Sequence, residues 1–206
     1  MTRDVVLVPG LWNPTGVLWP LAARLRRAGY APCIFDYRGR APLEGNVERL
    51  ARFTRDTLGN RPAHFVGHSL GGVVVLETLN RHPDIAVASA LLLGSPVRGS
   101  FAGRRFARTR FGRWLLGESG PCWEERGARW SRTAPLGVLA GSVPIGLGRM
   151  VGGRLPGLND GVVRVEETAV DGMAVSMVLP QPHSWMPVSP GVARMTERFL
   201  RTGSFG

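Results

Sequence analysis

Short apolar runs alternate with longer amphipathic stretches along this chain of 206 residues. The runs are rich in valine, leucine and alanine, as buried strands are, and they lie at 5–8, 31–35, 63–66, 86–93, 136–140 and 173–179. Apolar residues that recur every three or four positions predict helices at 18–28, 43–58, 69–81 and 191–200. This order of elements predicts an α/β fold in which helices flank a mostly parallel sheet of about six strands.

One long connection interrupts the alternation, between positions 93 and 136. It is rich in glycine, arginine and aromatic residues, and a connection of this length is unusual inside a compact domain. We therefore expect residues 98–135 to form an insertion above the sheet. The chain has no internal repeat and its length suits one core, so residues 1–206 are predicted to form a single domain.

The charge of the chain is strongly positive, with a formal net charge of +11. All 26 basic residues are arginine, a bias that a GC-rich coding sequence explains without any binding partner. Nine of them nevertheless fall between positions 98 and 132, interleaved with phenylalanine and tryptophan, and form a basic and aromatic patch. No helix-turn-helix, zinc-binding or RNA-recognition signature is present, so no nucleic-acid partner is expected.

The apolar runs, the first residues and the cysteines bear on the location of the protein. No apolar run approaches the roughly 18 residues that a membrane span requires. The chain passes directly into its first predicted strand, without the charged segment and cleavage site of a signal peptide. Cys33 and Cys122 are far apart in the sequence and indicate neither a metal site nor a disulfide. These features predict a cytoplasmic protein with reduced thiols.

The segment Gly67-His68-Ser69-Leu70-Gly71 joins a predicted strand to a predicted helix. This is the pattern of a nucleophile elbow, a sharp turn that lifts a serine hydroxyl clear of the backbone. Glycines fit on both sides because the turn brings strand and helix so close that a Cβ atom would clash. The turn would also lie at the carboxyl end of a parallel strand, where such sheets bind ligands. Ser69 is therefore the candidate nucleophile, and the alternative is a glycine-rich turn with an inert serine.

A serine hydroxyl needs a neighbouring base to remove its proton, and the chain has four histidines. His64 lies inside a predicted strand, His68 should point back into the turn, and His82 ends a helix at the surface. His183 follows the last predicted strand, where two nearby prolines restrict the backbone. By elimination His183 is the candidate general base, and the alternative is a solvated loop histidine.

The base in turn needs a carboxylate that orients it, and Asp160 is the candidate. It lies in an Asn-Asp-Gly turn after the fifth predicted strand, which would present its side chain at the same edge of the sheet. Glu166, Glu167 and Asp171 are close enough in sequence to reach the same region. Simple turn formation is a further explanation of the motif.

The tetrahedral intermediate of acyl transfer needs hydrogen-bond donors, and backbone amides at rigid turns serve this purpose well. One candidate is the amide of Leu70, at the start of the helix behind Ser69. The other is the amide of Leu11, just after the first predicted strand, where Gly10 permits close approach of the backbone. The alternative is that Pro9-Gly10 forms only a turn.

These segments together resemble the α/β-hydrolase superfamily, in particular small bacterial lipase-like and esterase-like serine hydrolases. Residues 8–12 are similar to its oxyanion loop, with Pro9 where the family usually has histidine, and residues 67–72 are similar to its elbow. Residues 94–96 are similar to the segment after its next strand, and residues 159–163 with His183 to its acid and base. The order Ser, Asp, His along the chain is also that of the family. The likeness covers nearly the whole chain and suggests a minimal, six-stranded version of the fold.

The resemblance implies cleavage of carboxylic esters through an acyl-serine intermediate, with Ser69, His183 and Asp160 as a triad and no metal or cofactor. The implied partner is a small-molecule acyl ester, lipids included. The insertion occupies the position of a cap or lid, in which Phe111, Trp114 and Leu115 would form an apolar helix stripe. The arginines around it suit peripheral contact with an anionic membrane or an acidic acyl carrier. The alternative is that the stripe only covers the core.

Two other functions fit the same residues. An acyltransferase would use the same triad but pass the acyl group to an acceptor other than water, and the sequence does not separate the two reactions. A non-catalytic binding protein would keep the fold and use the arginine-rich insertion for contact with anionic surfaces. Such binding would be sensitive to salt and would survive Ser69→Ala.

Overall fold

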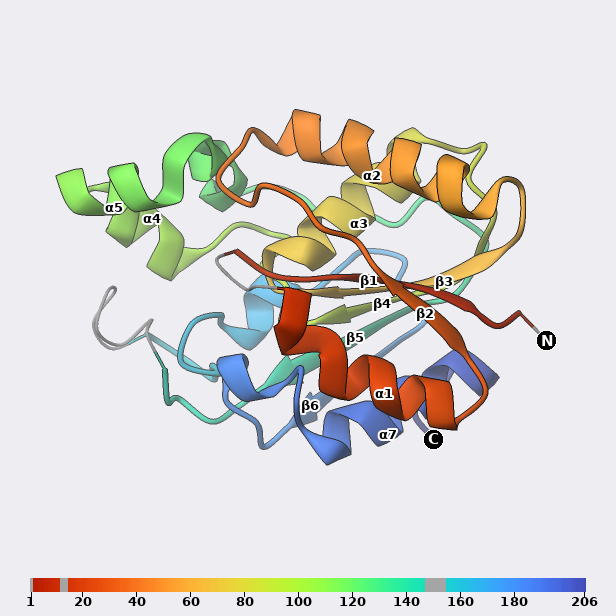
Figure 1. The fold of residues 1–206 in the computed structure, drawn as a ribbon. Coiled ribbons are helices and arrows are strands. Elements are labelled where there is room, and N and C mark those ends of the chain that lie inside the picture. The colour runs from red at the N-terminus through yellow and green to blue at the C-terminus, as the bar shows by residue number, and fades with distance from the viewer. Residues whose placement is uncertain (1, 12–14, 147–154) are drawn as a thin grey trace.

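The computed structural model of the protein describes residues 2–11, 15–146 and 155–206. Its centre is a six-stranded sheet in the order β2-β1-β3-β4-β5-β6, and every neighbouring pair is parallel (Figure 1). The strands are β1 (Asp4–Val8), β2 (Ala31–Ile34), β3 (Ala63–His68), β4 (Val87–Leu93), β5 (Leu136–Gly141) and β6 (Val175–Leu179). The predicted α/β fold with six parallel strands is confirmed.

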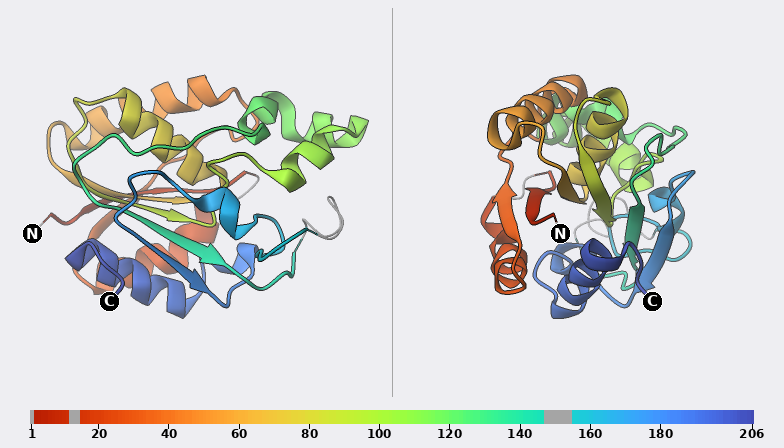
Figure 2. Two further views of the ribbon diagram at one scale, coloured as in Figure 1. Left: turned by 180° about the vertical axis from the view of Figure 1, so that it is seen from behind. Right: turned by 90° about the vertical axis from the view of Figure 1, so that its right-hand side faces the viewer.

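Helices cover both faces of the sheet (Figures 1 and 2). The elements α1 (Trp19–Arg27) and α7 (Pro190–Thr202) lie on one face, and α2 (Leu43–Leu58) and α3 (Leu70–Arg81) lie on the other. Each face has its own core because side chains alternate along a strand. In β1, for example, Val6 packs on the α2 and α3 side, whereas Leu7 packs on the α1 and α7 side.

The element boundaries differ from the predicted ones by a few residues. The helix expected from 69 begins at Leu70, because the backbone of Ser69 has a φ of 53°, outside the right-handed helical region. The strand expected to end at 66 continues through His68, which pairs with Leu93 of β4. The first helix is preceded by a 3-10 turn, η1 (Thr15–Leu18). Further 3-10 turns are η3 (Val165–Thr168) and η4 (His183–Trp185).

The arginine-rich connection between β4 and β5 contains two short helices and a 3-10 segment, α4 (Phe101–Ala107), α5 (Arg110–Leu116) and η2 (Gly117–Trp123). The views show α4 and α5 beyond the carboxyl ends of the strands, beside the layer of α2 and α3 (Figures 1 and 2). Phe111 and Trp114 are each 63% exposed, whereas Leu115 packs partly against the core. The alternative that the apolar stripe of Phe111, Trp114 and Leu115 only covers the core is therefore wrong for its two aromatic residues.

Two further expectations concern membranes and thiols. In the described part of the chain no helix is long and apolar enough to cross a membrane. Cys33 and Cys122 are both free; Cys33 lies in β2 and Cys122 in η2. Burial raises the pKa of the Cys122 thiol to about 11.

Candidate active site

Ser69 occupies a strained turn between β3 and α3. Among the described residues it is the only non-glycine residue with a positive φ, which is 53° with a ψ of −125°. Such a backbone costs of order 1–3 kcal/mol and persists only where the surroundings hold it. The Ser69 amide donates to the Leu93 carbonyl at 2.9 Å, and the Ser69 carbonyl accepts from the Gly72 amide at 3.0 Å. These bonds fix the residue at the carboxyl ends of β3 and β4.

The glycines around Ser69 allow the helix to approach the sheet. A Cβ atom on Gly67 would lie 2.4 Å from the Cα atom of Gly72. On Gly71 it would lie 2.2 Å from the Val8 carbonyl oxygen, and on Gly72 1.9 Å from the Ser95 hydroxyl oxygen. Real Cβ contacts are never this short, so α3 can begin here only with glycine at these positions. The close approach expected from the sequence is present.

His183 and Asp160 are in direct contact. The His183 Nδ1 atom lies 2.7 Å from Asp160 Oδ2, and both side chains are buried. The backbone couples the same two residues, because the His183 amide donates to the Asp160 carbonyl at 2.9 Å. A carboxylate in this position favours a proton on Nδ1, which leaves Nε2 as a hydrogen-bond acceptor.

The turn around Asp160 holds its carboxylate in place. Asp160 Oδ1 accepts from the amides of Val162 at 2.9 Å and Val163 at 2.7 Å, so the oxygen that faces away from His183 is also bonded. Asn159 Oδ1 accepts from the Gly161 amide at 3.0 Å, and Gly161 has a φ of +93°. The Asn-Asp-Gly motif thus forms a turn and orients the carboxylate at once.

Glycines at the ends of β4 and β5 make room for this pair. A Cβ atom on Gly94 would lie 3.1 Å from Asp160 Oδ2 and 3.2 Å from His183 Nδ1. On Gly141 it would lie 2.7 Å from the Asp160 Cβ atom. Since Gly94 directly follows Leu93, the acceptor of the Ser69 amide, the histidine–aspartate pair and the serine turn occupy the same edge of the sheet. Sequence reasoning had not assigned this role to either glycine.

His68, the neighbour of Ser69, contacts the loop that carries His183. Its Nε2 atom lies 3.2 Å from the His183 carbonyl oxygen, and the two imidazole rings are 4.9 Å apart. Complete burial, and secondly the charge of His183, lower the pKa of His68 to about 3. The ring is therefore neutral near pH 7 and can donate its Nε2 proton to that carbonyl. The sequence predicted that His68 would point back into the turn, but not that it would reach a residue 115 positions away.

Leu70 and Leu11, whose amides are the candidate oxyanion donors, both lie near Gly39. A Cβ atom there would be 3.0 Å from Leu11 Cδ1 and 3.9 Å from Leu70 Cδ2. Leu70 is the first residue of α3, where backbone amides have no acceptor within the helix. The segment before Leu11 is held by Tyr37, whose hydroxyl donates to the Pro9 carbonyl at 2.8 Å. Trp12, the last residue of the expected oxyanion loop, lies outside the described residues.

The competing carboxylates have other partners. Glu167 accepts from the Phe101 amide at 2.6 Å and from Arg164 at 3.1 Å, and Glu166 forms an ion pair with the same arginine. Asp171 pairs with Arg98. None of these contacts involves a histidine, whereas Asp160 contacts His183 directly.

The other two histidines lie away from this edge. His64 is bonded through Nδ1 to the Ser89 hydroxyl at 2.8 Å, and burial lowers its pKa. His82 ends α3 and contacts Arg55 and Glu48 at the surface. Among the described residues no group of three or more His, Cys, Asp or Glu side chains is placed to hold a metal ion.

Exposed apolar side chains gather around the same end of the molecule. Seven large hydrophobic residues are exposed in the described part of the chain, and all but Val178 lie on segments that follow the carboxyl ends of strands. These six are Trp19, Phe111, Trp114, Ile145, Leu158 and Trp185. Trp185 is two residues after His183, and Leu158 is two residues before Asp160. Two of the exposed apolar residues, Trp185 and Leu158, therefore lie close along the chain to the buried histidine–aspartate pair.

The fold and the site define a class of α/β proteins in which a strained serine turn and a buried histidine–aspartate pair meet at one edge of a parallel sheet. Residues 5–200 of the chain match the alpha/beta hydrolase family. The chain therefore belongs to this family, as the sequence motifs had suggested.

Individual relatives include esterases and other hydrolases. The chain is 32% identical over 104 residues to the pimeloyl-[acyl-carrier protein] methyl ester esterase of Methylococcus capsulatus, an alignment that covers 45% of this chain and 37% of that protein. It is also similar to the structure of the metagenomic carboxyl esterase MGS0156, with a TM-score of 0.73, 20% identity and coverage of 98% and 76% of the two chains. A pyrethroid hydrolase from Sphingobium faniae JZ-2 matches with a TM-score of 0.62, 16% identity and 98% coverage of each chain. At these identities the structural likeness shows a shared fold.

Proposed function

We propose that the protein is a serine hydrolase that cleaves carboxylic esters, with Ser69 as nucleophile, His183 as general base and acid, and Asp160 as the orienting carboxylate. The observation that carries this proposal is the buried 2.7 Å contact of His183 with Asp160 at the same strand ends as the strained Ser69 turn. A structural turn alone would need neither the positive φ of a serine nor a carboxylate on the histidine.

The proposed reaction has two halves. In the first, His183 Nε2 takes the proton of Ser69 Oγ as this oxygen bonds to the ester carbonyl carbon, and the tetrahedral oxyanion accepts from the amides of Leu11 and Leu70. The carbon–alkoxide bond then breaks, and His183 returns the proton to the leaving alcohol. In the second half, water loses a proton to His183 as its oxygen bonds to the acyl carbon; the bond from this carbon to Ser69 Oγ then breaks, and His183 returns the proton to Ser69 Oγ as the acid leaves.

The proposed substrate is a small acyl ester with a substantial apolar part. The exposed side chains of Trp185 and Leu158, each two residues from a member of the proposed triad, would contact such a group. The relatives named above, a methyl ester esterase and a carboxyl esterase, favour the same class of bond. The cytoplasmic location expected from the sequence is compatible with this substrate class and stays a prediction.

Labelling with a fluorophosphonate tests the proposed nucleophile. We expect one adduct, mapped by mass spectrometry to Ser69, which disappears in Ser69→Ala and falls sharply in His183→Ala because the hydroxyl is no longer activated. Hydrolysis of a short soluble ester should fall by a factor of about 10³ or more in either variant. Ser184→Ala is a matched control, because Ser184 is an exposed serine beside His183 that should leave both readouts unchanged.

The outcome separates the proposal from its alternatives. A folded wild-type protein without an adduct would overturn the triad and favour a non-catalytic binding protein. An adduct on Ser69 with ester products formed from added alcohols, in preference to the free acid, would favour an acyltransferase instead of a hydrolase.

A further inference from the structure

The segment that forms α4 and α5 carries a uniform positive charge. Between positions 98 and 117 the sequence contains six arginines and no aspartate or glutamate. The nearest acidic residues along the chain are Glu118, Glu124 and Glu125, after α5. Arg98 and Arg104 have acidic partners within the protein, Asp171 and Glu125. Arg105, Arg108 and Arg110 form no ion pair with a described residue, and their mutual repulsion favours an anionic partner.

One face of α4 forms an arginine-lined hollow. Phe101, Arg104, Arg105 and Arg108 recur at the spacing of one helix face and line a cavity of about 540 Å³. Two guanidinium groups lie near the Phe101 ring, that of Arg105 at 5.8 Å and that of Arg164 at 5.2 Å from its centre. Phosphate and carboxylate groups are the ligands that clustered guanidinium groups bind best.

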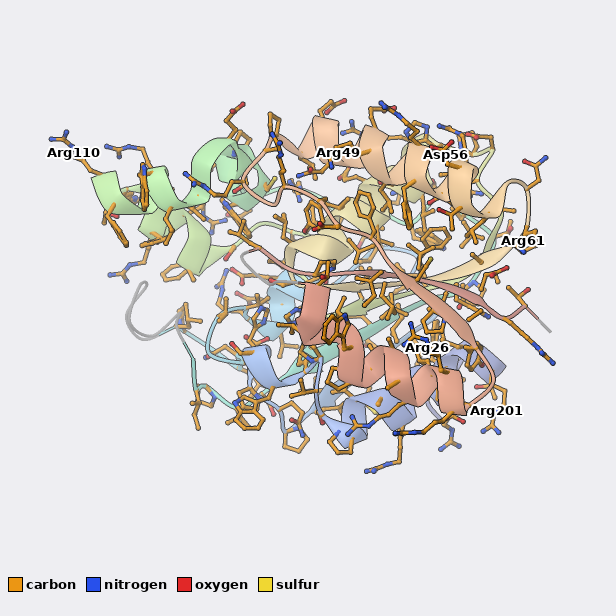
Figure 3. All side chains as sticks on the ribbon, in the orientation of Figure 1. Arg26, Arg49, Asp56, Arg61, Arg110 and Arg201 are labelled. Atoms are coloured by element: carbon orange, nitrogen blue, oxygen red, sulfur yellow. The ribbon has the colours of Figure 1, made fainter. Side chains whose placement is uncertain are left out.

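The next helix, α5, presents aromatic rings to solvent. Phe111 and Trp114 are each 63% exposed, and their ring centres are 5.9 Å apart. Arg40 holds this pair in place, because its guanidinium lies 5.3 Å from the Trp114 ring centre and donates to the Trp114 carbonyl. Arg110 projects from the outer end of the same helix (Figure 3). Ordered aromatic rings beside exposed arginines are typical of helices that lie in a membrane interface.

This surface is at the carboxyl-end side of the sheet, as is the candidate site (Figure 1). Trp185, another exposed apolar residue, is two residues after His183. A bilayer that contacted α5 would therefore lie on the same side of the molecule as the candidate site, and not at the opposite end, where both described termini lie (Figure 1).

We propose that Arg105, Arg108, Phe111 and Trp114, here called the α4–α5 surface, dock on an anionic phospholipid membrane. The arginines bind headgroup phosphates, and the two rings enter the interface between headgroups and acyl chains. An anionic lipid interface offers phosphates to the guanidinium groups and an adjacent apolar layer to the two exposed rings, so one partner of this kind fits both parts of the surface. If the function proposed above holds, docking brings lipid esters to Ser69.

Co-sedimentation with large vesicles tests the proposal. We expect the protein to bind vesicles that contain phosphatidylglycerol and not vesicles of phosphatidylcholine alone. Arg105→Gln/Arg108→Gln should weaken binding by about 5-fold per arginine. In 0.5 M salt the Debye length is about five times shorter than in dilute buffer, so the charge-dependent part of the binding is largely lost. Phe111→Ser/Trp114→Ser should abolish the part of the binding that survives this salt concentration. Circular dichroism and the melting temperature would show that each variant is folded.

A matched control separates docking from the general charge of the protein. Arg49→Gln/Arg52→Gln removes the same charge from the exposed face of α2, on which Figure 3 shows Arg49, and should leave vesicle binding unchanged. Equal weakening by both arginine pairs would overturn the proposal, because binding would then follow net charge alone. Wild-type protein that binds an acidic carrier protein but no vesicle would also overturn it.

Ser69→Ala distinguishes this inference from the proposed activity. This variant should bind anionic vesicles as the wild type does, because Ser69 is not part of the α4–α5 surface. Docking that persists in a protein without any hydrolase activity would support the surface and contradict the proposed function. Ester hydrolysis by a protein that does not bind vesicles would support the proposed function and contradict docking by the α4–α5 surface.

Discussion

At the scale of single residues, His68 shows how burial changes an ionisable group. Its pKa of about 3 lies far below the ordinary value of 6.5, because the ring is fully buried and faces His183. Between these two pH values the unfolded chain binds a proton that the folded protein does not. The free energy of unfolding should therefore decrease as the pH falls from about 6.5 toward about 3.

His68→Gln should remove this contribution while keeping a side-chain N–H that can reach the His183 carbonyl. Within that pH range we expect the free energy of unfolding to fall more steeply for the wild type than for the variant. The difference between the two slopes should be up to about 1.4 kcal/mol per pH unit. Urea denaturation at pH 7, 6, 5 and 4 measures the difference. His82→Gln, at the surface end of α3, is the matched control, and equal slopes for the wild type and His68→Gln would contradict the burial argument.

At the scale of elements, the same glycine substitution should have opposite effects in two helices. Gly71 lies in the first turn of α3, where a Cβ atom would come within 2.2 Å of the Val8 carbonyl oxygen. Gly45 lies in the first turn of α2, and nothing lies within 4 Å of the corresponding position. The two sites differ in the space next to the helix and not in secondary structure.

Gly71→Ala should destabilise the protein by several kcal/mol, because either α3 or the end of β1 must move. Gly45→Ala should instead stabilise it by about 0.5 kcal/mol, since alanine loses less backbone entropy in a helix. Denaturant melts of both variants at pH 7 measure these changes. A tolerated Gly71→Ala would mean that the approach of α3 to the sheet is looser than the contacts indicate.

At the scale of the whole molecule, one sheet separates two apolar cores. Leu50 of α2 is fully buried on one face, and Leu21 of α1 is buried on the other. Because β1, β3, β4 and β5 contribute side chains to both cores, loss of packing on one face should weaken the other face as well.

Leu50→Ala and Leu21→Ala should therefore each lower the free energy of unfolding by about 2–5 kcal/mol in one cooperative transition. Far-UV circular dichroism and tryptophan fluorescence should report the same midpoint for each variant. Two separate transitions in either variant would show that the cores unfold independently and that the molecule is not one cooperative unit.

Local patterns in the sequence were sufficient for the order of the elements and for the candidate residues. Runs of valine and leucine predicted the strands, since a strand buried on both faces needs no polar alternation. The helix at Leu43–Leu58 was predicted at its observed bounds, because its apolar stripe is regular. Ser69 and Asp160 could be singled out because glycine-flanked turns have recognisable residues at fixed spacing.

Contacts between distant segments could be identified only in the folded structure. The approach of His68 to His183, the space that Gly94 and Gly141 leave beside Asp160, and the exposure of Phe111 and Trp114 depend on how elements pack. The apolar stripe of α5 is the same in the sequence whether it faces a core or solvent. Spacing along a chain shows which residues share a helix face or a turn. Packing between elements determines which residues that face or turn contacts, and the candidate site is formed by such contacts between elements.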